Sequence, residues 1–191
     1  QVTYVNLAIA PTTDFTRTVT VVVQDGGGAN SNSATAYINV LGVNDAPIFS
    51  DFDGGNTFTE GGSAVVIDND VTVADAELDA LDSGNGNYEG ATLTIARTDD
   101  ANSQDSFGNN GQLSTLTQGQ PLVYNSITVG TVLTNSNGTL GLMFAGNATS
   151  ALVDGVLQSI TYANSSDNPP AGVSLDWLFN DGTGGVAMEP I

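Results

Sequence analysis

The segment Ile160-Thr161-Tyr162-Ala163-Asn164 has a close counterpart 158 residues earlier, in Val2-Thr3-Tyr4-Val5-Asn6. After two residues drop out, the match resumes at an offset of 156, where apolar residues alternate over 19–23 and again over 175–179. Alternation of apolar side chains with others predicts half-buried β-strands. Two matching blocks in the same order indicate an internal repeat of about 156–158 residues.

The same offset aligns Asp25-Gly26 with Asp181-Gly182 and divides the 191 residues into two parts. Residues 1–45 correspond to the C-terminal strands of one repeat plus a linker, and residues 46–191 to the next repeat, which we expect to lack its final strand. A segment of about 45 residues with two or three strands buries too little surface to fold alone. We therefore expect the strand at 34–41, or its hairpin, to dock on the edge left open by the missing strand, within the chain or on a neighbour.

Alternating apolar residues bounded by turn-forming residues predict several strands. They are Phe15–Gln24, Ala34–Leu41, Ala64–Ala74, Ala91–Arg97, Pro121–Tyr124, Ile127–Thr134, Thr139–Ala145 and Val173–Phe179. Ser150–Gln158 instead has apolar residues at helical spacing, which predicts a short helix leading into a strand at Ile160–Tyr162. Asn135-Ser136-Asn137-Gly138 predicts a hairpin turn, and Asp99–Gly111 a long polar loop. The predicted fold class is all-β, a two-sheet sandwich with one short helix.

The chain is strongly acidic, with 21 acidic residues and only two basic ones, Arg17 and Arg97. The resulting formal charge of −19 repels phosphate, so nucleic acid and anionic membranes are excluded as partners. His, Lys and Cys are absent, which excludes an imidazole base, a thiolate nucleophile, a Schiff base and the usual zinc sites. No apolar run is long enough to predict a membrane-spanning helix. Carboxylates without basic partners suit hard cations such as Ca²⁺ best.

The segment Tyr37–Phe49 has the sequence YINVLGVNDAPIF and resembles the linker between cadherin repeats. Gly42 stands where such linkers usually have a calcium-binding Asp. Three segments are similar to the long cadherin-like repeats of giant bacterial surface and secreted proteins, namely Thr59–Val65, Val73–Leu81 and Ser159–Asp167. The block around Tyr162, followed by Phe179-Asn180-Asp181-Gly182, is also similar to chondroitin sulfate proteoglycan repeats.

This resemblance covers most of the chain and implies an immunoglobulin/cadherin-like sandwich that is used in tandem. It further implies an extracellular location, calcium at the junctions between repeats, and a place in adhesin-type bacterial proteins. Neighbouring repeats of the same protein would then be its structural partners.

The candidate metal ligands begin with Asp75, Glu77 and Asp79, which are acidic residues at alternate positions after a predicted strand. In an extended loop, carboxylates two residues apart can converge on one cation, although the spacing is not that of an EF-hand. In an immunoglobulin-like strand order this loop lies at the N-terminal end, where the linker Asn44-Asp45 and the loop of Asp181 also arrive. We therefore predict a calcium site at this end, with solvated turn residues as the alternative interpretation.

We expect the acidic residues outside this N-terminal end to have other roles. The resemblance implies that Glu60 faces the opposite, C-terminal junction as a further calcium ligand. The remaining pairs and clusters are expected to be solvated loop residues that keep the protein soluble. They are Asp51, Asp53, Asp68, Asp70, Asp99, Asp100 and Asp105.

The sequence thus favours a non-enzymatic, calcium-binding tandem-repeat module of a secreted or cell-surface bacterial protein, acting in adhesion or as a rigid stalk. The alternative is a carbohydrate-recognising β-sandwich module whose calcium or loops bind a surface glycan; a hydrolase that uses paired carboxylates is a third. Exposed aromatic residues on one face would favour sugar binding. Acidic residues gathered at the domain junction would favour a spacer.

Overall fold

A computed structural model describes residues 3–8 and 16–191 and divides the chain into two compact units, Gln1–Val43 and Asn44–Ile191. We call them unit 1 and unit 2. The division falls two residues before the boundary expected from the sequence, so Asn44 and Asp45 belong to unit 2.

Unit 1 contains an antiparallel hairpin of β1 (Arg17–Val21) and β2 (Ala34–Ile38). The two strands pair from Arg17 opposite Ile38 to Val21 opposite Ala34. Both strands lie inside the segments predicted from apolar alternation, and the part of the first prediction before residue 16 lies outside the described residues.

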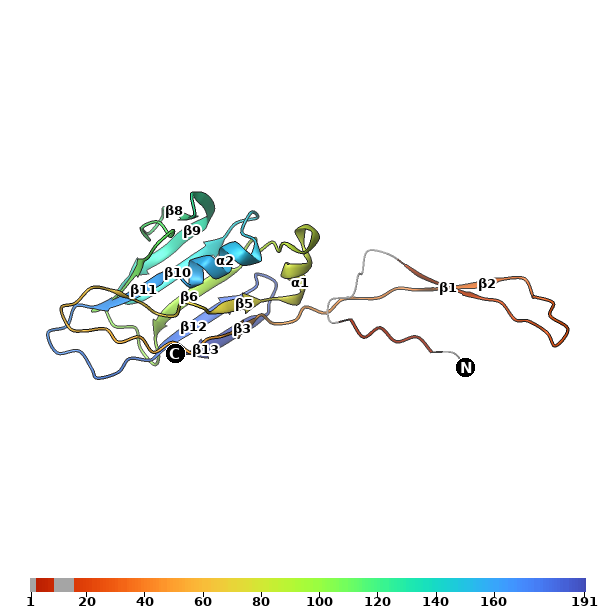
Figure 1. The fold of residues 1–191 in the computed structure, drawn as a ribbon, viewed down its shortest axis with the longest axis horizontal. Coiled ribbons are helices and arrows are strands. Elements are labelled where there is room, and N and C mark those ends of the chain that lie inside the picture. Colours follow the sequence, from red (N-terminus) through yellow and green to blue (C-terminus); the bar gives the residue numbers. More distant parts are fainter. Residues whose placement is uncertain (1–2, 9–15) are drawn as a thin grey trace. The chain divides into compact units, whose positions relative to one another are not determined.

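Unit 2 is an antiparallel β-sandwich, as the sequence predicted, and Figure 1 shows its strands with α2 crossing in front of β10. One sheet has six strands in the order β13-β12-β6-β10-β9-β8. Their bounds are β6 Thr92–Arg97, β8 Pro121–Tyr124, β9 Ile127–Ser136, β10 Thr139–Phe144, β12 Leu175–Asn180 and β13 Val186–Pro190. The remaining strands form a three-stranded sheet, β4-β11-β7, and a β3-β5 pair. Their bounds are β3 Ile48–Ser50, β4 Val65–Val66, β5 Thr72–Ala74, β7 Asp105–Asn109 and β11 Ile160–Asn164.

The core follows from the alternation along the strands. Leu93 and Ile95 of β6 are fully buried, as are Trp177 and Phe179 of the neighbouring β12. The ring of Phe49 meets both aromatic rings of β12 edge-on, at centroid distances of 6.4 and 6.2 Å. Aromatic side chains bury large areas and favour such edge-to-face contacts, so this cluster fixes β3 onto the six-stranded sheet.

Two local predictions are confirmed in unit 2. The helix α2 (Ser150–Leu157) lies where apolar residues recur at helical spacing. Its Gly155 is required by packing, since a Cβ there would collide with the ring of Tyr124. The turn between β9 and β10 places Asn137 and Gly138 at φ values of 52° and 74°, the left-handed pair that a tight hairpin turn needs.

The predicted strand Ala64–Ala74 is wrong as a single element, because the chain turns in its middle. Asp68 is buried there, and its Oδ1 accepts hydrogen bonds from the backbone N–H groups of Asp70 and Val71. An Asp side chain that binds the backbone two or three residues ahead forms a turn and competes with strand pairing. The segment is therefore split into β4 and β5.

The predicted loop Asp99–Gly111 is also wrong, since it contains β7, which pairs with β11 along its whole length. The prediction that Asp105 is a solvated loop residue fails with it, because Asp105 faces the interior of the sandwich and is buried. The next inward-facing residue of the strand is Phe107, which packs against Tyr162. The alternation of inward and outward residues in β7 was not recognised, because one of its inward residues is an Asp rather than an apolar residue.

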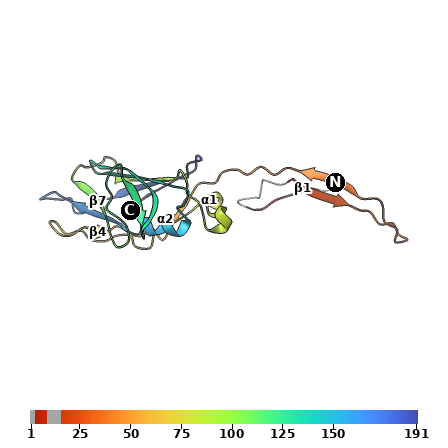
Figure 2. The same cartoon turned by 90° about the horizontal axis from the view of Figure 1, so that it is seen from above.

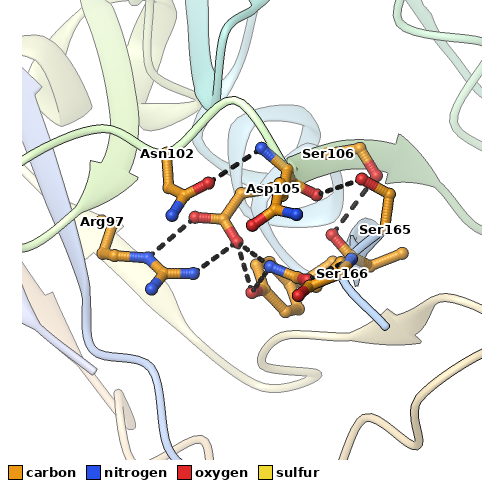
Figure 3. A network of polar contacts seen from close by, with 10 residues as sticks. Arg97, Asn102, Asp105, Ser106, Ser165 and Ser166 are labelled. Atoms are coloured by element: carbon orange, nitrogen blue, oxygen red, sulfur yellow. Dashed lines mark hydrogen bonds and ion pairs between the residues drawn. The ribbon is translucent and has the colours of Figure 1, made fainter. Parts of the chain in front are cut away.

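Asp105 is the centre of a polar network that joins the two larger sheets (Figure 3). Arg97 of β6 donates from Nε to Asp105 Oδ2 at 2.9 Å and from its terminal nitrogen to Oδ1 at 2.7 Å. From β11, Tyr162 Oη and Asn164 Nδ2 donate to the same Oδ1 at 2.6 and 2.7 Å. The network places a bidentate ion pair between the six-stranded and three-stranded sheets, where it fixes their relative position.

The last strand also differs from expectation. Val186–Pro190 form β13, which pairs with the outer edge of β12 from Asn180 opposite Val186 to Asp176 opposite Pro190. The edge that we expected to be left open, and to receive the unit 1 hairpin, is therefore paired within unit 2.

Candidate metal centre

Asp75 is the most informative residue of the predicted site. It caps the helix α1 (Ala76–Ala80), and its Oδ1 accepts hydrogen bonds from the backbone N–H groups of Glu77 and Leu78 at 3.1 and 2.9 Å. The residue is only 1% exposed, and its second oxygen, Oδ2, is buried without a hydrogen-bond partner. A buried carboxylate oxygen without a hydrogen-bond partner lowers the stability of the folded state, and a cation bound to this atom would offset that loss.

Asp181 lies in the loop after β12 and is equally buried. Its Oδ1 accepts from the backbone N–H groups of Thr183, Gly184 and Gly185 at 2.6, 2.8 and 3.0 Å. Its Oδ2 accepts from Asn44 Nδ2 at 2.7 Å, and the amide oxygen of Asn44 accepts from Thr183 Oγ1 at 2.7 Å. These bonds hold Asn44 at the side of Asp181, as the sequence predicted.

The two carboxyl groups have opposite electrostatic environments. Burial raises the pKa of Asp75, and the negative charges of Asp181 and Glu77 add to this effect beyond what its backbone hydrogen bonds offset. Burial also acts on Asp181, but the hydrogen bonds from Asn44 and from the Thr183–Gly184 backbone outweigh it and hold its pKa below the usual value. The folded protein therefore favours the ionised form of Asp181 and disfavours the ionised form of Asp75, which a nearby positive charge would stabilise.

The backbone carbonyl oxygen of Asp45 lies near Asp181 because Gly185, which packs against both, has no side chain. The Asp45 N–H donates to Glu77 Oε2 at 3.1 Å, which ties the entering chain to α1. A Cβ built on Gly185 would collide with Asp181 Oδ2 and with the carbonyl oxygen of Asp45. Only glycine lets these two oxygens lie so close to the backbone.

The donor atoms at this end of unit 2 are of the type that a hard cation binds. This end offers carboxylate oxygens of Asp75, Glu77 and Asp181, the Asn44 amide oxygen and the Asp45 carbonyl oxygen, which are oxygen donors of the kind that Ca²⁺ prefers. The carboxylate oxygens of Asp75, Glu77 and Asp181 do not all lie within 4.8 Å of one another, so these side chains would have to move closer together to share one ion.

Asp181 Oδ2 and the Asp45 carbonyl oxygen pack closely on Gly185, and we call this arrangement the Gly185 cradle. The unpartnered Asp75 oxygen and the Gly185 cradle are the two features that a bound cation would account for. Mg²⁺ fits less well, since it demands a strict octahedron and keeps much of its water.

Two predicted ligands have other positions. Asp79 lies one helical turn after Asp75, since the segment is a helix rather than the extended loop we assumed, and its Oδ2 accepts from the Asp75 backbone N–H at 3.1 Å. Its Oδ1 accepts from Tyr88 Oη at 2.8 Å and Ser150 Oγ at 2.5 Å, so Asp79 braces α1 against α2. Glu60 lies exposed in the loop between β3 and β4, and Figure 2 shows β4 at the side of unit 2 away from α1.

A second acidic cluster was not singled out from the sequence as a site. In the described part of the chain, Asp53, Asp68 and Asp70 are the one set of three carboxylates whose oxygens all lie within 4.8 Å of one another. Asp68 is already satisfied by four backbone N–H groups, from Asp53, Gly54, Asp70 and Val71. Partial desolvation and the neighbouring carboxylates raise the pKa of Asp70. The spacing of Asp68 and Asp70 in an apolar segment was the signal that could have revealed this turn.

Gly185→Ala is expected to test the cradle. The added methyl group has no room between Asp181 and Asp45, so we expect it to lower the free energy of unfolding of unit 2 by about 1–3 kcal/mol and to weaken any stabilisation by calcium. Gly172→Ala is the matched control, because no atom lies within 4 Å of the position that its methyl group would take, and we expect a change within about 0.5 kcal/mol. Urea unfolding of both variants measures the difference, and equal stabilities would contradict the cradle.

A groove of about 330 Å³ lies between the loop before β4 and the loop before β12. Its lining combines Phe58, Tyr162 and Asn164 with Pro169 and Pro170. None of the residues that line the groove belongs to the candidate site at Asn44, Asp75 and Asp181.

Within the described part of the chain, α1 and α2 have five and eight residues, and no helix there is long and apolar enough to cross a membrane. Comparison of the chain with protein-family models, with curated proteins and with solved structures gave no match.

Proposed function

We propose that this chain is a non-enzymatic, calcium-binding tandem-repeat module of a secreted or cell-surface bacterial protein, acting in adhesion or as a rigid stalk. The observation that supports this proposal most is the buried, unpartnered Oδ2 of Asp75 beside the carboxylate of Asp181. A divalent cation there would supply the positive charge that a chain with only two arginines lacks.

The position of the site explains why calcium would matter for a tandem module. Asn44 is the first residue of unit 2, directly after the end of unit 1 at Val43. A cation bound by Asp75, Asp181 and the oxygens of Asn44 and Asp45 would fix the segment through which the chain enters unit 2. Because the unfolded chain has no such cage, the binding energy would also become folding energy.

The carbohydrate-binding alternative has weaker support. The exposed aromatic residues of the described chain are Tyr4 and Tyr37, and both belong to unit 1. The groove beside Phe58 and Tyr162 is the feature of unit 2 that a sugar could use. The acidic residues gathered at the Asn44 end of unit 2 favour the spacer instead.

The proposal predicts that millimolar calcium stabilises unit 2 relative to chelator. If free calcium is about a hundred times the dissociation constant, the gain is about 2.7 kcal/mol, or roughly 5–10 °C in melting temperature. Thermal melts in calcium, magnesium and chelator measure it, and magnesium should stabilise much less.

The control for the position of the ion is Asp53→Asn combined with Asp70→Asn, which removes charge from the second acidic cluster. This variant should keep the calcium response of the wild type. A wild-type melting temperature indifferent to calcium would refute the proposal, and a response lost in the control variant would assign the ion to the other cluster.

A further inference from the structure

The six-stranded sheet of unit 2 has a second face, on the side away from the core. Because side chains alternate along a strand, the residues between the buried ones of each strand point to this side. Strand pairing aligns those of β9, β10, β6, β12 and β13 in three rows across the sheet, and we call these rows the outer face. The first row is Thr131, Met143, Thr92, Asn180 and Val186; the middle row is Thr134, Gly141, Thr94, Leu178 and Met188; the third row is Ser136, Thr139, Ala96, Asp176 and Pro190.

The outer face gathers apolar side chains that water can reach. Residues 44–191 expose eight large apolar side chains, and four of these belong to the outer face. They are Met143, Leu178, Val186 and Met188, at 39%, 38%, 45% and 58% exposure. They include both methionines of the chain, whose flexible side chains adapt to the surface of a partner. A contiguous exposed apolar patch marks a site of protein interaction.

Charge selects the kind of partner that the outer face accepts. Of the 19 acidic residues in the segment 44–191, Asp176 alone belongs to the outer face, and its Oδ1 accepts a hydrogen bond from Thr98 Oγ1 at 2.7 Å. The other 18 lie outside it, where a second copy of this chain would bring carboxylate against carboxylate. A cationic partner would bind that acidic surface instead. The outer face is therefore the surface through which two copies can meet with little repulsion.

The three rows are complementary to themselves about a two-fold axis that runs along the middle row. Such an axis places Leu178 and Thr94 against the same residues of the second copy, so that apolar side chains meet apolar side chains. It also places the first row on the third. Asp176 then faces Asn180 of the second copy, whose amide group can donate to the carboxylate, and the two Asp176 side chains stay apart. Sheets that pack face to face in this way lie about 10 Å apart.

The outer face is large enough to form a dimer. Five strands about 4.8 Å apart and three rows about 6.8 Å apart cover roughly 24 by 20 Å, or about 480 Å² on each copy. Two copies together would bury about 1,000 Å², which is near the lower limit for a specific interface. A dimer of this size should be weak and should depend on the protein concentration.

We propose that the outer face binds the outer face of a second copy of this chain, sheet on sheet, about a two-fold axis through Leu178 and Thr94. Apolar contact between the two middle rows stabilises this dimer, and the acidic surface around it opposes it. Salt therefore favours the dimer, because it screens the repulsion and leaves the apolar contact intact. The surface lies wholly in unit 2 and includes no residue of the candidate calcium site.

Sedimentation velocity of the full chain tests the proposal. We expect a species of twice the 19.4 kDa chain mass that grows with protein concentration and on raising the salt from about 0.02 to about 0.5 M. Leu178→Lys places two like charges against each other at the axis and should abolish the dimer, although it lowers the net negative charge. Leu81→Lys is the matched control, because Leu81 is 46% exposed and lies outside the outer face, and it should retain the dimer. A chain that stays monomeric throughout, or a dimer that survives Leu178→Lys unchanged, would overturn the proposal.

Methionine oxidation gives a second readout that needs no substitution. Peroxide converts exposed methionine into its sulfoxide, and burial in an interface slows this reaction. Met143 and Met188 should therefore oxidise more slowly at concentrations where the dimer forms than at concentrations where the chain is monomeric, as measured by mass spectrometry of the initial rates. In Leu178→Lys the two rates should be equal. Equal rates in the wild type at both concentrations would contradict burial of the outer face.

Discussion

Asp75→Asn is expected to be more stable than the wild type without calcium and less stable than the wild type with calcium. Without calcium the variant should unfold at a higher denaturant concentration than the wild type, and with calcium at a lower one. The reason is that the wild-type carboxylate is buried with one oxygen unpaired, close to the negative charge of Asp181. An asparagine keeps the helix cap through its side-chain oxygen and carries no charge to desolvate.

The pH dependence of the wild type has the same origin. The pKa of Asp75 is higher in the folded protein than its ordinary value of 3.8, so between these two values the folded state binds more protons than the unfolded state. The free energy of unfolding contributed by this group therefore decreases as the pH rises through that window, and stays low at neutral pH. Calcium should remove this dependence, since a bound cation favours the ionised carboxylate.

Asp181→Asn is the matched comparison for the same measurement. Hydrogen bonds hold the pKa of Asp181 below its usual value, so its charge is favoured in the folded state. Removing that charge should destabilise the chain with or without calcium. Urea unfolding of both variants in calcium and in chelator separates the two residues. If Asp75→Asn also destabilised the calcium-free chain, Oδ2 of Asp75 would have a partner and the cation site would lose its main support.

The surroundings of Asp75 were predictable from the sequence only in part. The sequence predicted which acidic residues gather at the Asn44 end, because the order of strands in a sandwich decides which loops share an end. It did not predict that the Asp75 segment forms a helical turn, since alternating acids fit a helix as well as an extended loop. The residues after Asp75, Ala76–Ala80, are mostly good helix formers behind an N-cap residue, and this was the signal for α1.

In the fold as well, elements with a clear local pattern were predicted, whereas an element that depends on a tertiary contact was not. Strands with apolar residues at every second position, such as β6 and β10, were predicted nearly to their ends, because the period itself encodes burial. β7 was missed because its inward positions are Asp105 and Phe107, and an inward Asp looks like a loop residue until its partner is known. That partner, Arg97, lies on another sheet, and no local pattern connects the two.

Arg97→Ala is expected to have the largest effect on the stability of unit 2. The Arg97 side chain is 19% exposed and that of Asp105 fully buried, so the substitution leaves an uncompensated buried carboxylate. Loss of one partner of a buried pair costs about 3–5 kcal/mol, or roughly 6–20 °C in melting temperature. Adding Asp105→Asn to Arg97→Ala should restore part of this loss, because the buried charge is then removed as well.

Acid titration distinguishes this electrostatic effect from a loss of packing. In the wild type, burial is outweighed by the bonds from Arg97, Tyr162 and Asn164, so the pKa of Asp105 lies below 3.8 when the chain is folded. Its contribution to stability is therefore complete above that value and is lost as the pH falls through the folded pKa. Without Arg97 the pKa of Asp105 moves upward and the carboxyl group takes up its proton at a higher pH. The difference in unfolding free energy between wild type and Arg97→Ala should accordingly narrow as the pH is lowered from about 6 to about 3. A difference that stays constant over this range would show that Arg97 acts by packing alone.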